Sequence, residues 1–196
     1  MAHPNPTALR RAASNVHLLW LVLAAPAVWL VFHAIVLKTR LPYLEWTGLL
    51  SCWLLIAALS VTPLQLVFGA LPWLRVRRRY LGVASFGYAL LHLLVWLSNA
   101  KPGAFLHSFA RIEILPGWVA IAVMLPLALT SSNWAVRRLG PAWKSLQRWI
   151  YPMAVLTLLH WLLTNKDWTM IIVYTGPLIL LMMWRVWRYQ RRARGA

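Results

Sequence analysis

Long uncharged, mostly apolar stretches alternate with short charged segments along the whole chain. A membrane-spanning helix needs about 20 such residues, with a lower limit near 17. Two of the stretches have 17 residues and reach that limit if flanking side chains extend to the interface. The pattern therefore predicts an all-α integral membrane bundle of six helices. The predicted spans lie within residues 16–37, 46–74, 80–100, 114–136, 149–165 and 168–184.

Helix-breaking residues and chain ends refine this picture. The second stretch contains Pro63 and Pro72, so its helix is expected to end near Phe68 or Gly69. Residues 1–13 and 188–196 are rich in arginine and are predicted to be basic tails. The membrane domain is then expected to cover residues 14–187.

The charge is distributed very unevenly across the predicted membrane. The chain has 20 lysines and arginines, only three acidic residues and a net charge of +17. With the N-terminus in the cytoplasm, fifteen of the 20 basic residues fall on the cytoplasmic side and five on the other. This bias predicts that both termini are cytoplasmic. Topology and anionic lipid head groups explain the basicity, so nucleic-acid binding is not expected.

Several common kinds of site are not predicted by the sequence. The single cysteine, Cys52, lies within an apolar stretch, which excludes a disulfide or a cysteine-ligated metal centre within the chain. The sequence also lacks a glycine-rich phosphate loop, HExxH and GxSxG. The chemistry of the protein is therefore expected inside the bilayer.

Two histidines occur in near-identical apolar surroundings, YALLHLLVWL (88–97) and AVLTLLHWLL (154–163). His92 lies 13 residues after Arg79, and His160 lies 12 residues after Arg148. A helix rises about 1.5 Å per residue, so the two side chains lie roughly 20 and 18 Å into a core about 30 Å thick. The third and fifth spans run in the same direction. Both imidazoles are therefore predicted at one level, in the outer half of the membrane.

A depth-matched histidine pair favours a shared ligand. Ionisable side chains inside membranes are rare and usually serve a pathway or a cofactor. Two neutral imidazoles on separate helices are suited to bind one haem iron as axial ligands. The alternative is that each ring hydrogen-bonds to a neighbouring helix. Zinc is less favoured, because it needs three or four ligands and no third is evident.

The remaining histidines give weaker indications. His33 lies in the outer half of the first span, where a packing role is favoured over a place near the pair. His17 lies at the inner end of that span, either at the interface or beside an inner cofactor. His107 belongs to the outer loop and can face a partner.

Two segments together resemble a known family. They are TPLQLVFGALPWLRVRRRYLGVASFGYALLHLLVWL (62–97) and LALTSSNWAVRRLGPAWKSLQRWIYPMAVLTLLHWLL (127–163). They resemble the MsrQ (YedZ) family, the haem-binding membrane subunits of bacterial periplasmic methionine sulfoxide reductase systems. This family belongs to the ferric-reductase-like transmembrane superfamily. By position, its haem histidines fall on His92 and His160.

The resemblance implies an electron relay in the bacterial inner membrane. Members of the family pass electrons from the quinone pool, or from a cytosolic flavin reductase, through haem b to a periplasmic molybdopterin partner, MsrP. That partner reduces methionine sulfoxide in oxidised proteins, and some membrane subunits are described as carrying FMN. The resemblance thus implies an electron-transfer subunit whose partner performs the catalytic chemistry.

One position departs from the family pattern. Where the family often has a histidine 13 residues before the later ligand, this chain has Gln147. Because a glutamine amide is a poor ligand for haem iron, one haem is predicted, in the outer half. Electrons would then enter through a flavin or a quinone near the cytoplasmic face. The residues expected around that inner site, which could otherwise hold a second haem, are His17, Arg77, Arg78, Arg79 and Gln147.

Two other functions remain open at this stage. A transmembrane ferric or cupric reductase would use a similar haem, but such proteins usually carry a soluble flavin and nicotinamide domain. A cofactor-free transporter or structural protein is the second alternative. A proton-coupled carrier would more often have a carboxylate within its spans, and the six predicted spans contain none.

Overall fold

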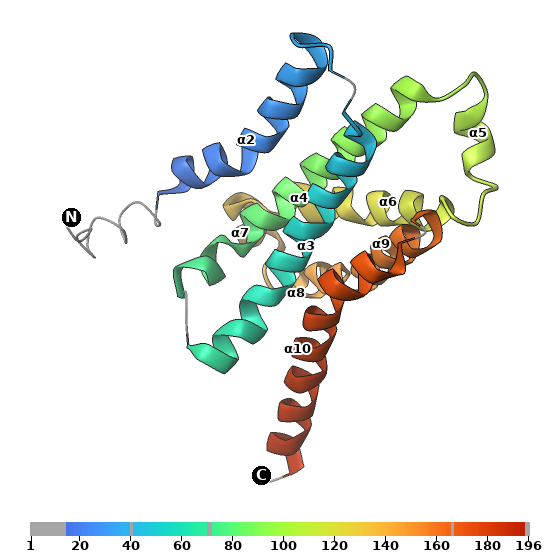
Figure 1. The fold of residues 1–196 in the computed structure, drawn as a ribbon. Helices are drawn as coiled ribbons and strands as arrows, with labels where there is room; N and C mark the ends of the chain where they lie inside the picture. The colour runs from blue at the N-terminus through green and yellow to red at the C-terminus, as the bar shows by residue number, and fades with distance from the viewer. Residues whose placement is uncertain (1–14, 40, 70–71, 166, 195–196) are drawn as a thin grey trace, which may run out of the picture.

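In the computed structural model, the described residues (15–39, 41–69, 72–165 and 167–194) form helices and no strand, which confirms the all-α prediction (Figure 1). Four helices are long, and α6 and α9 are of intermediate length. Three short helices, α5, α7 and α8, were not predicted. The bounds are α2 Val16–Ile35, α3 Tyr43–Phe68, α4 Pro72–Asn99, α5 Ala104–Ser108, α6 Leu115–Leu129, α7 Asn133–Leu139, α8 Pro141–Gln147, α9 Ile150–Thr164 and α10 Trp168–Arg194.

Among the described residues, α2, α3, α4 and α10 are long and apolar enough to cross a membrane. A fifth span results if α6 and α7, which meet at 90°, are counted as one broken span. Helices α6 and α9 have 15 residues each, about 22 Å of helix, which is less than a bilayer core of about 30 Å. The protein therefore has the helices of a multi-pass membrane protein. The count of six spans and the cytoplasmic position of the termini stay predictions.

The helix ends follow local chemistry. Helix α3 ends at Phe68 as predicted, because Gly69 adopts a left-handed conformation (φ 63°) and its N–H donates to the Gln65 carbonyl. Helix α4 begins at Pro72, eight residues before the apolar stretch predicted to start at Tyr80. Proline is favoured in the first turn of a helix, where its missing N–H costs nothing. The segment 75–79, between two predicted spans, is therefore part of α4.

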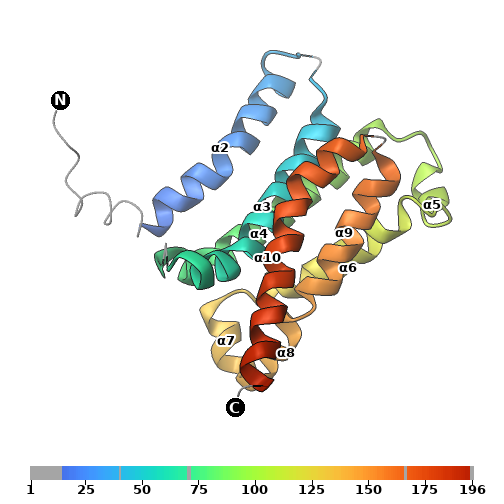
Figure 2. The same cartoon turned by 60° about the horizontal axis from the view of Figure 1, so that its bottom comes forward.

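The fourth predicted span is broken by hydroxyl side chains. Thr130 Oγ1 donates to the Pro126 carbonyl, and Ser131 Oγ donates to the Leu127 carbonyl. The Pro126 carbonyl keeps its bond from the Thr130 N–H, whereas the Leu127 carbonyl loses its helical partner because the Ser131 N–H donates to the Ala128 carbonyl, and the Ser131 hydroxyl takes that place. Ser132 then caps α7 by accepting from the Ala135 N–H. The chain turns at this point and continues along one end of the bundle, predicted to be the cytoplasmic end, as α7 and α8 (Figure 2).

Helices α3 and α4 form the centre of the bundle. Ser51 Oγ donates to the Ser85 carbonyl and Ser85 Oγ donates to the Ser51 carbonyl, each at 2.9 Å. Such small residues allow close helix packing in a membrane. A cluster of buried apolar residues also joins α3 to α6, α9 and α10. The centre thus places α4 and α9, which carry the two matched histidines, in one bundle.

Tyr88 attaches α2 to this centre at a proline. Pro26 interrupts α2, and the Tyr88 hydroxyl accepts from the Ala27 N–H at 3.0 Å while donating to the Leu23 carbonyl at 2.8 Å. The hydroxyl therefore bridges a donor and an acceptor that would otherwise bond directly in a regular helix. Helix α2 lies at the edge of the bundle in both views (Figures 1 and 2).

Candidate functional site

His92 on α4 and His160 on α9 meet inside the bundle. Their ring centroids are 6.5 Å apart, and the ring planes are inclined by 80°. Both residues are half-buried. The structure therefore brings together the two histidines that residue counting placed at one depth.

Each imidazole is fixed by a main-chain carbonyl. His92 Nδ1 lies 2.9 Å from the Leu44 carbonyl oxygen in the first turn of α3, and His160 Nδ1 lies 2.9 Å from the Glu113 carbonyl oxygen just before α6. A carbonyl only accepts, so Nδ1 carries the proton in both rings. The second nitrogen, Nε2, is then left in the unprotonated form that binds metal ions.

A glycine makes room for each ring. Gly48 lies four residues after Leu44, and Gly117 lies four residues after Glu113. A Cβ atom added at Gly48 would lie 3.0 Å from His92 Nδ1, and one added at Gly117 would lie 2.9 Å from His160 Nδ1. The same arrangement therefore occurs twice: a carbonyl that accepts, and a glycine one helical turn later that lets the ring approach.

Sequence reasoning missed these two glycines. A signal was available, because Gly48 and Gly117 lie near the outer ends of the second and fourth predicted spans. That is the level at which both histidines were placed. Depth alone, however, does not show which glycine faces which ring.

The histidine pair fits a single six-coordinate metal ion. Metal–imidazole bonds are about 2 Å long and the ring centre lies about 1 Å beyond the nitrogen, so two opposed ligands place their ring centres roughly 6 Å apart. The observed separation of 6.5 Å is close to this value. A closed zinc site is not favoured, since the described residues contain no group of three or more histidine, cysteine, aspartate or glutamate side chains suited to a metal.

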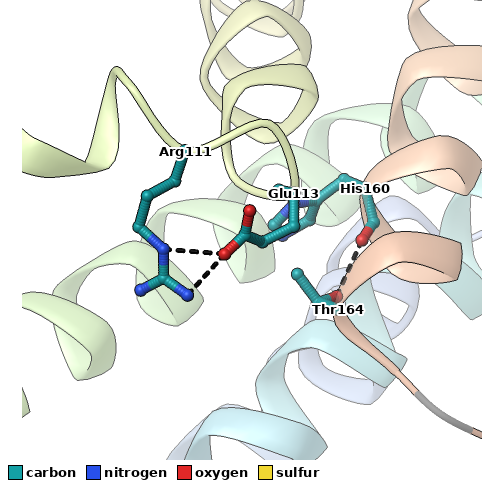
Figure 3. A network of polar contacts seen from close by, with 4 residues as sticks. All are labelled: Arg111, Glu113, His160 and Thr164. Atoms are coloured by element: carbon teal, nitrogen blue, oxygen red, sulfur yellow. Dashed lines mark hydrogen bonds and ion pairs between the residues drawn. The ribbon is translucent and has the colours of Figure 1, made fainter.

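The turn that holds His160 is braced by an ion pair (Figure 3). Arg111 Nε donates to Glu113 Oε1 at 2.7 Å, and the second guanidinium nitrogen lies 2.5 Å from the same oxygen. The Arg111 carbonyl also accepts from the N–H groups of Ile114 and Leu115 where α6 begins. On the other side, Thr164 Oγ1 donates to the His160 carbonyl at 2.7 Å. The outer turn and α9 are thus joined at His160.

The ion pair of this turn is expected to stabilise the protein above acidic pH. A hydrogen bond from its own backbone N–H and then the Arg111 side chain lower the pKa of Glu113 below its usual 4.5. The stabilisation is therefore present above the usual pKa and is lost as the pH falls through the lowered value of the folded protein. Thermal unfolding of the wild type and of Glu113→Gln should differ slightly near neutral pH and converge in acid. A difference that persists in acid would contradict this assignment.

Gln147 holds the bend between α6 and α7. Its Nε2 donates to the Leu127 carbonyl at 3.1 Å and lies 3.2 Å from Thr130 Oγ1, while Trp143 Nε1 donates to the Thr130 carbonyl at 2.9 Å. Gln147 also lines an inner pocket of about 340 Å³ together with Arg78 and Arg79.

The other predicted inner residues lie apart from this pocket. Arg77 packs its guanidinium over the Tyr80 ring, 5.8 Å from the centroid. His17 is exposed in the first turn of α2, where its N–H donates to the Asn15 side chain. Neither residue is among the described residues that line the pocket. The structure therefore groups Gln147 with Arg78 and Arg79, but not with His17 or Arg77.

His33 and His107 contact residues other than the His92–His160 pair. The His33 ring packs against Trp29, with centroids 4.3 Å apart, and its Nδ1 lies 3.3 Å from Thr39 Oγ1. His107 is exposed on α5, near Gly103.

Comparison with known proteins agrees with this architecture. A family model described as "Ferric reductase like transmembrane component" matches residues 45–158. The "Protein-methionine-sulfoxide reductase heme-binding subunit MsrQ" of Xanthomonas axonopodis pv. citri is 37% identical over 147 residues, 72% of this chain and 67% of that protein. The protein of the same name from Brucella ovis is 32% identical over 188 residues, 90% of this chain and 84% of that protein. No solved structure matches the chain. The chain therefore belongs to the ferric-reductase-like transmembrane family and, within it, to the MsrQ family.

Proposed function

We propose that this chain is the haem b electron-transfer subunit of a protein-methionine-sulfoxide reductase system. The observation that carries the proposal is the His92–His160 pair, whose rings are 6.5 Å apart and whose Nδ1 atoms are both bound to carbonyls. The similar proteins from Xanthomonas and Brucella are named as heme-binding subunits. The geometry and the family names support the same function.

In this proposal His92 and His160 hold the iron through Nε2. Haem bound there supplies reversible one-electron chemistry. The Leu44 and Glu113 carbonyls hold the Nδ1 protons, which fixes the ring orientations and makes both imidazoles better ligands. With both histidines holding the iron, the site would leave substrate chemistry to another protein. The site is therefore suited to electron transfer, and reduction of methionine sulfoxide belongs to a partner.

The proposed direction of transfer runs from the cytoplasmic to the periplasmic side of a bacterial inner membrane. The donor is the quinone pool or a cytosolic flavin reductase, and the acceptor is a periplasmic molybdopterin subunit like MsrP. Delivery on that side agrees with the predicted outer position of the pair, in which His160 contacts the turn that carries Arg111 and Glu113. Both termini lie in the cytoplasm in this orientation, which follows the bias of positive charge.

We propose a single haem, with electrons entering on the side of Gln147. Gln147 uses its amide donors to hold the end of α6, which is a structural role rather than that of a metal ligand. His17 is exposed and lies outside the pocket that contains Gln147, so these two residues do not form a second ligand pair. A flavin such as FMN, or a quinone, remains the carrier proposed for this inner side.

A reduced-minus-oxidised absorbance spectrum of the detergent-purified chain tests this function. We expect a b-type signal of about one haem per chain, because one histidine pair supplies both axial ligands. About two haems per chain would keep the relay but contradict the role given to Gln147. A chain without haem, after expression with sufficient haem, would leave the two histidines as packing residues and favour a cofactor-free membrane protein.

A further inference from the structure

The inner pocket that contains Gln147 has a rim of positive charge. Its cationic side chains come from α4, from α8, from the residue that follows α8 and from α10. Three regions that are distant in sequence, α4, residues 144–148 and α10, thus converge on one cavity of about 340 Å³. The five cations that line it are Arg78, Arg79, Lys144, Arg148 and Arg185.

Within the part of the chain that the structure describes, no acidic side chain lines this rim. The chain has only three acidic residues, Glu45, Glu113 and Asp167. Glu45 lies 17 residues before the pocket residue Thr62 on α3, and Asp167 lies 18 residues before Arg185, along α10. Either separation corresponds to roughly 25 Å of helix.

The hydrogen bonds of the rim arginines go to neutral groups. Arg78 donates to Thr62 Oγ1 at 2.9 Å, and Arg79 donates to Asn133 Oδ1 at 2.6 Å. Arg185 donates to the Tyr151 hydroxyl at 3.1 Å. These contacts orient the guanidinium groups but leave their charge uncompensated. An anionic group from outside the protein would therefore find several cationic partners at this rim.

Membrane topology alone does not explain why five cationic side chains line one cavity. The preference for positive charge on the cytoplasmic side is satisfied by any basic residue at the membrane surface. Arg137 and Arg138 on α7 are exposed, as Arg78, Lys144 and Arg148 are, but neither is among the described residues that line the pocket. The rim residues differ because they face a common cavity.

The wall of the same cavity is apolar. Among its members, Leu55 and Leu59 on α3, Met124 on α6 and Met153 on α9 are buried in the core of the bundle. A ligand that satisfies both rim and wall has a negatively charged head and an apolar body. In a membrane protein, an anionic phospholipid has this composition, and basic pockets between transmembrane helices bind such head groups.

We propose that the inner pocket binds an anionic phospholipid, with the phosphate on the arginine and lysine rim and an acyl chain against the apolar wall. A quinone ring is neutral and would leave the rim unbalanced. A flavin phosphate shares the negative charge, and FMN is one of the carriers proposed above for the side of Gln147, so it is the competing occupant that the experiment must separate from lipid. The lipid site does not depend on the proposed haem, because none of its lining residues belongs to the histidine pair.

The experiment measures the lipid retained by the full-length chain and its affinity for added lipid. The chain is purified in neutral detergent, and bound lipids and flavins are identified by mass spectrometry. After delipidation, the protein is titrated with short-chain phosphatidylglycerol and with phosphatidylcholine. We expect retained lipid enriched in anionic species relative to the membrane, and roughly tenfold or greater preference for phosphatidylglycerol, because the neutral head group cannot balance the rim.

A charge-matched pair of variants tests the pocket itself. The double variant Lys144→Gln with Arg148→Gln removes two rim charges from side chains that make no hydrogen bond within the described part of the chain. We expect its affinity for phosphatidylglycerol to fall roughly thirtyfold. The control Arg137→Gln with Arg138→Gln removes the same charge outside the pocket and is expected to change the affinity by less than about twofold.

Several results would overturn the lipid site. They are equal binding of the two lipids, an equal loss in the control variant, or FMN retained one per chain in place of lipid and lost on rim substitution. Haem is quantified in the same samples. Lipid retained without haem would support the lipid site and contradict the electron relay. Haem retained without a preference for anionic lipid would support the relay and contradict the lipid site.

Discussion

His160→Ala is expected to abolish haem binding, and His92→Ala is expected to do the same. Each variant removes one of two axial ligands, and an iron held by a single remaining imidazole is retained poorly. His160→Ala also leaves the Glu113 carbonyl without its side-chain donor, at a cost of about 1–3 kcal/mol if the group stays buried. Haem per chain, quantified on the purified protein, measures the effect.

Two control variants separate ligand loss from general damage. His33→Ala removes another half-buried histidine of a membrane helix, one that packs against Trp29 rather than against the pair. Gln147→Ala removes the contacts that hold the end of α6. Both are expected to retain the outer haem. Full haem retention in both His92→Ala and His160→Ala would refute the ligand assignment.

Gly117→Ala is expected to displace the His160 ring. The added Cβ would lie 2.9 Å from Nδ1 and 3.0 Å from Cε1, and real Cβ atoms essentially never approach another atom that closely. The ring must therefore shift, which breaks its bond to the Glu113 carbonyl. Loss of the hydrogen-bond partner that orients a metal-binding histidine typically weakens metal binding by about 10–100-fold. Haem retention during dilution or competition measures the loss.

The matched control for this substitution is Gly82→Ala on α4. A Cβ at Gly82 meets nothing within 4 Å, and alanine in a helix interior is favoured over glycine by roughly 0.5–1 kcal/mol. Gly82→Ala should therefore keep haem and leave stability equal or higher. Gly48→Ala, with its Cβ 3.0 Å from His92 Nδ1, should behave like Gly117→Ala. Wild-type haem retention in both ring-facing variants would contradict the role of the two glycines.

The long helices and the pairing of the two histidines could be predicted from the sequence, but the short helices α5, α7 and α8 could not. Apolar run length locates membrane helices because the bilayer core has a fixed thickness. Gly69 ends α3 because its left-handed conformation suits glycine, a local property of the chain. His92 and His160 meet because equal residue counts along parallel helices give equal depth.

The tertiary structure decided what residue counting cannot. Depth along a helix follows from the sequence, but the direction in which each side chain faces depends on how the helices are rotated and packed. The carbonyls of Leu44 and Glu113 carry no sequence signal as acceptors, since every residue has one.

For the basic residues of the inner pocket, too, the sequence determined one part and the tertiary structure another. The excess of arginine on one side of the predicted membrane was evident from the sequence. Only the fold, through the 90° bend after α6 and the packing of α8 and α10, brings Lys144, Arg148 and Arg185 to the same cavity as Arg78 and Arg79. Hydrophobic length and helical rise are properties of one segment, whereas a shared site requires contacts between segments, and packing alone determines those contacts.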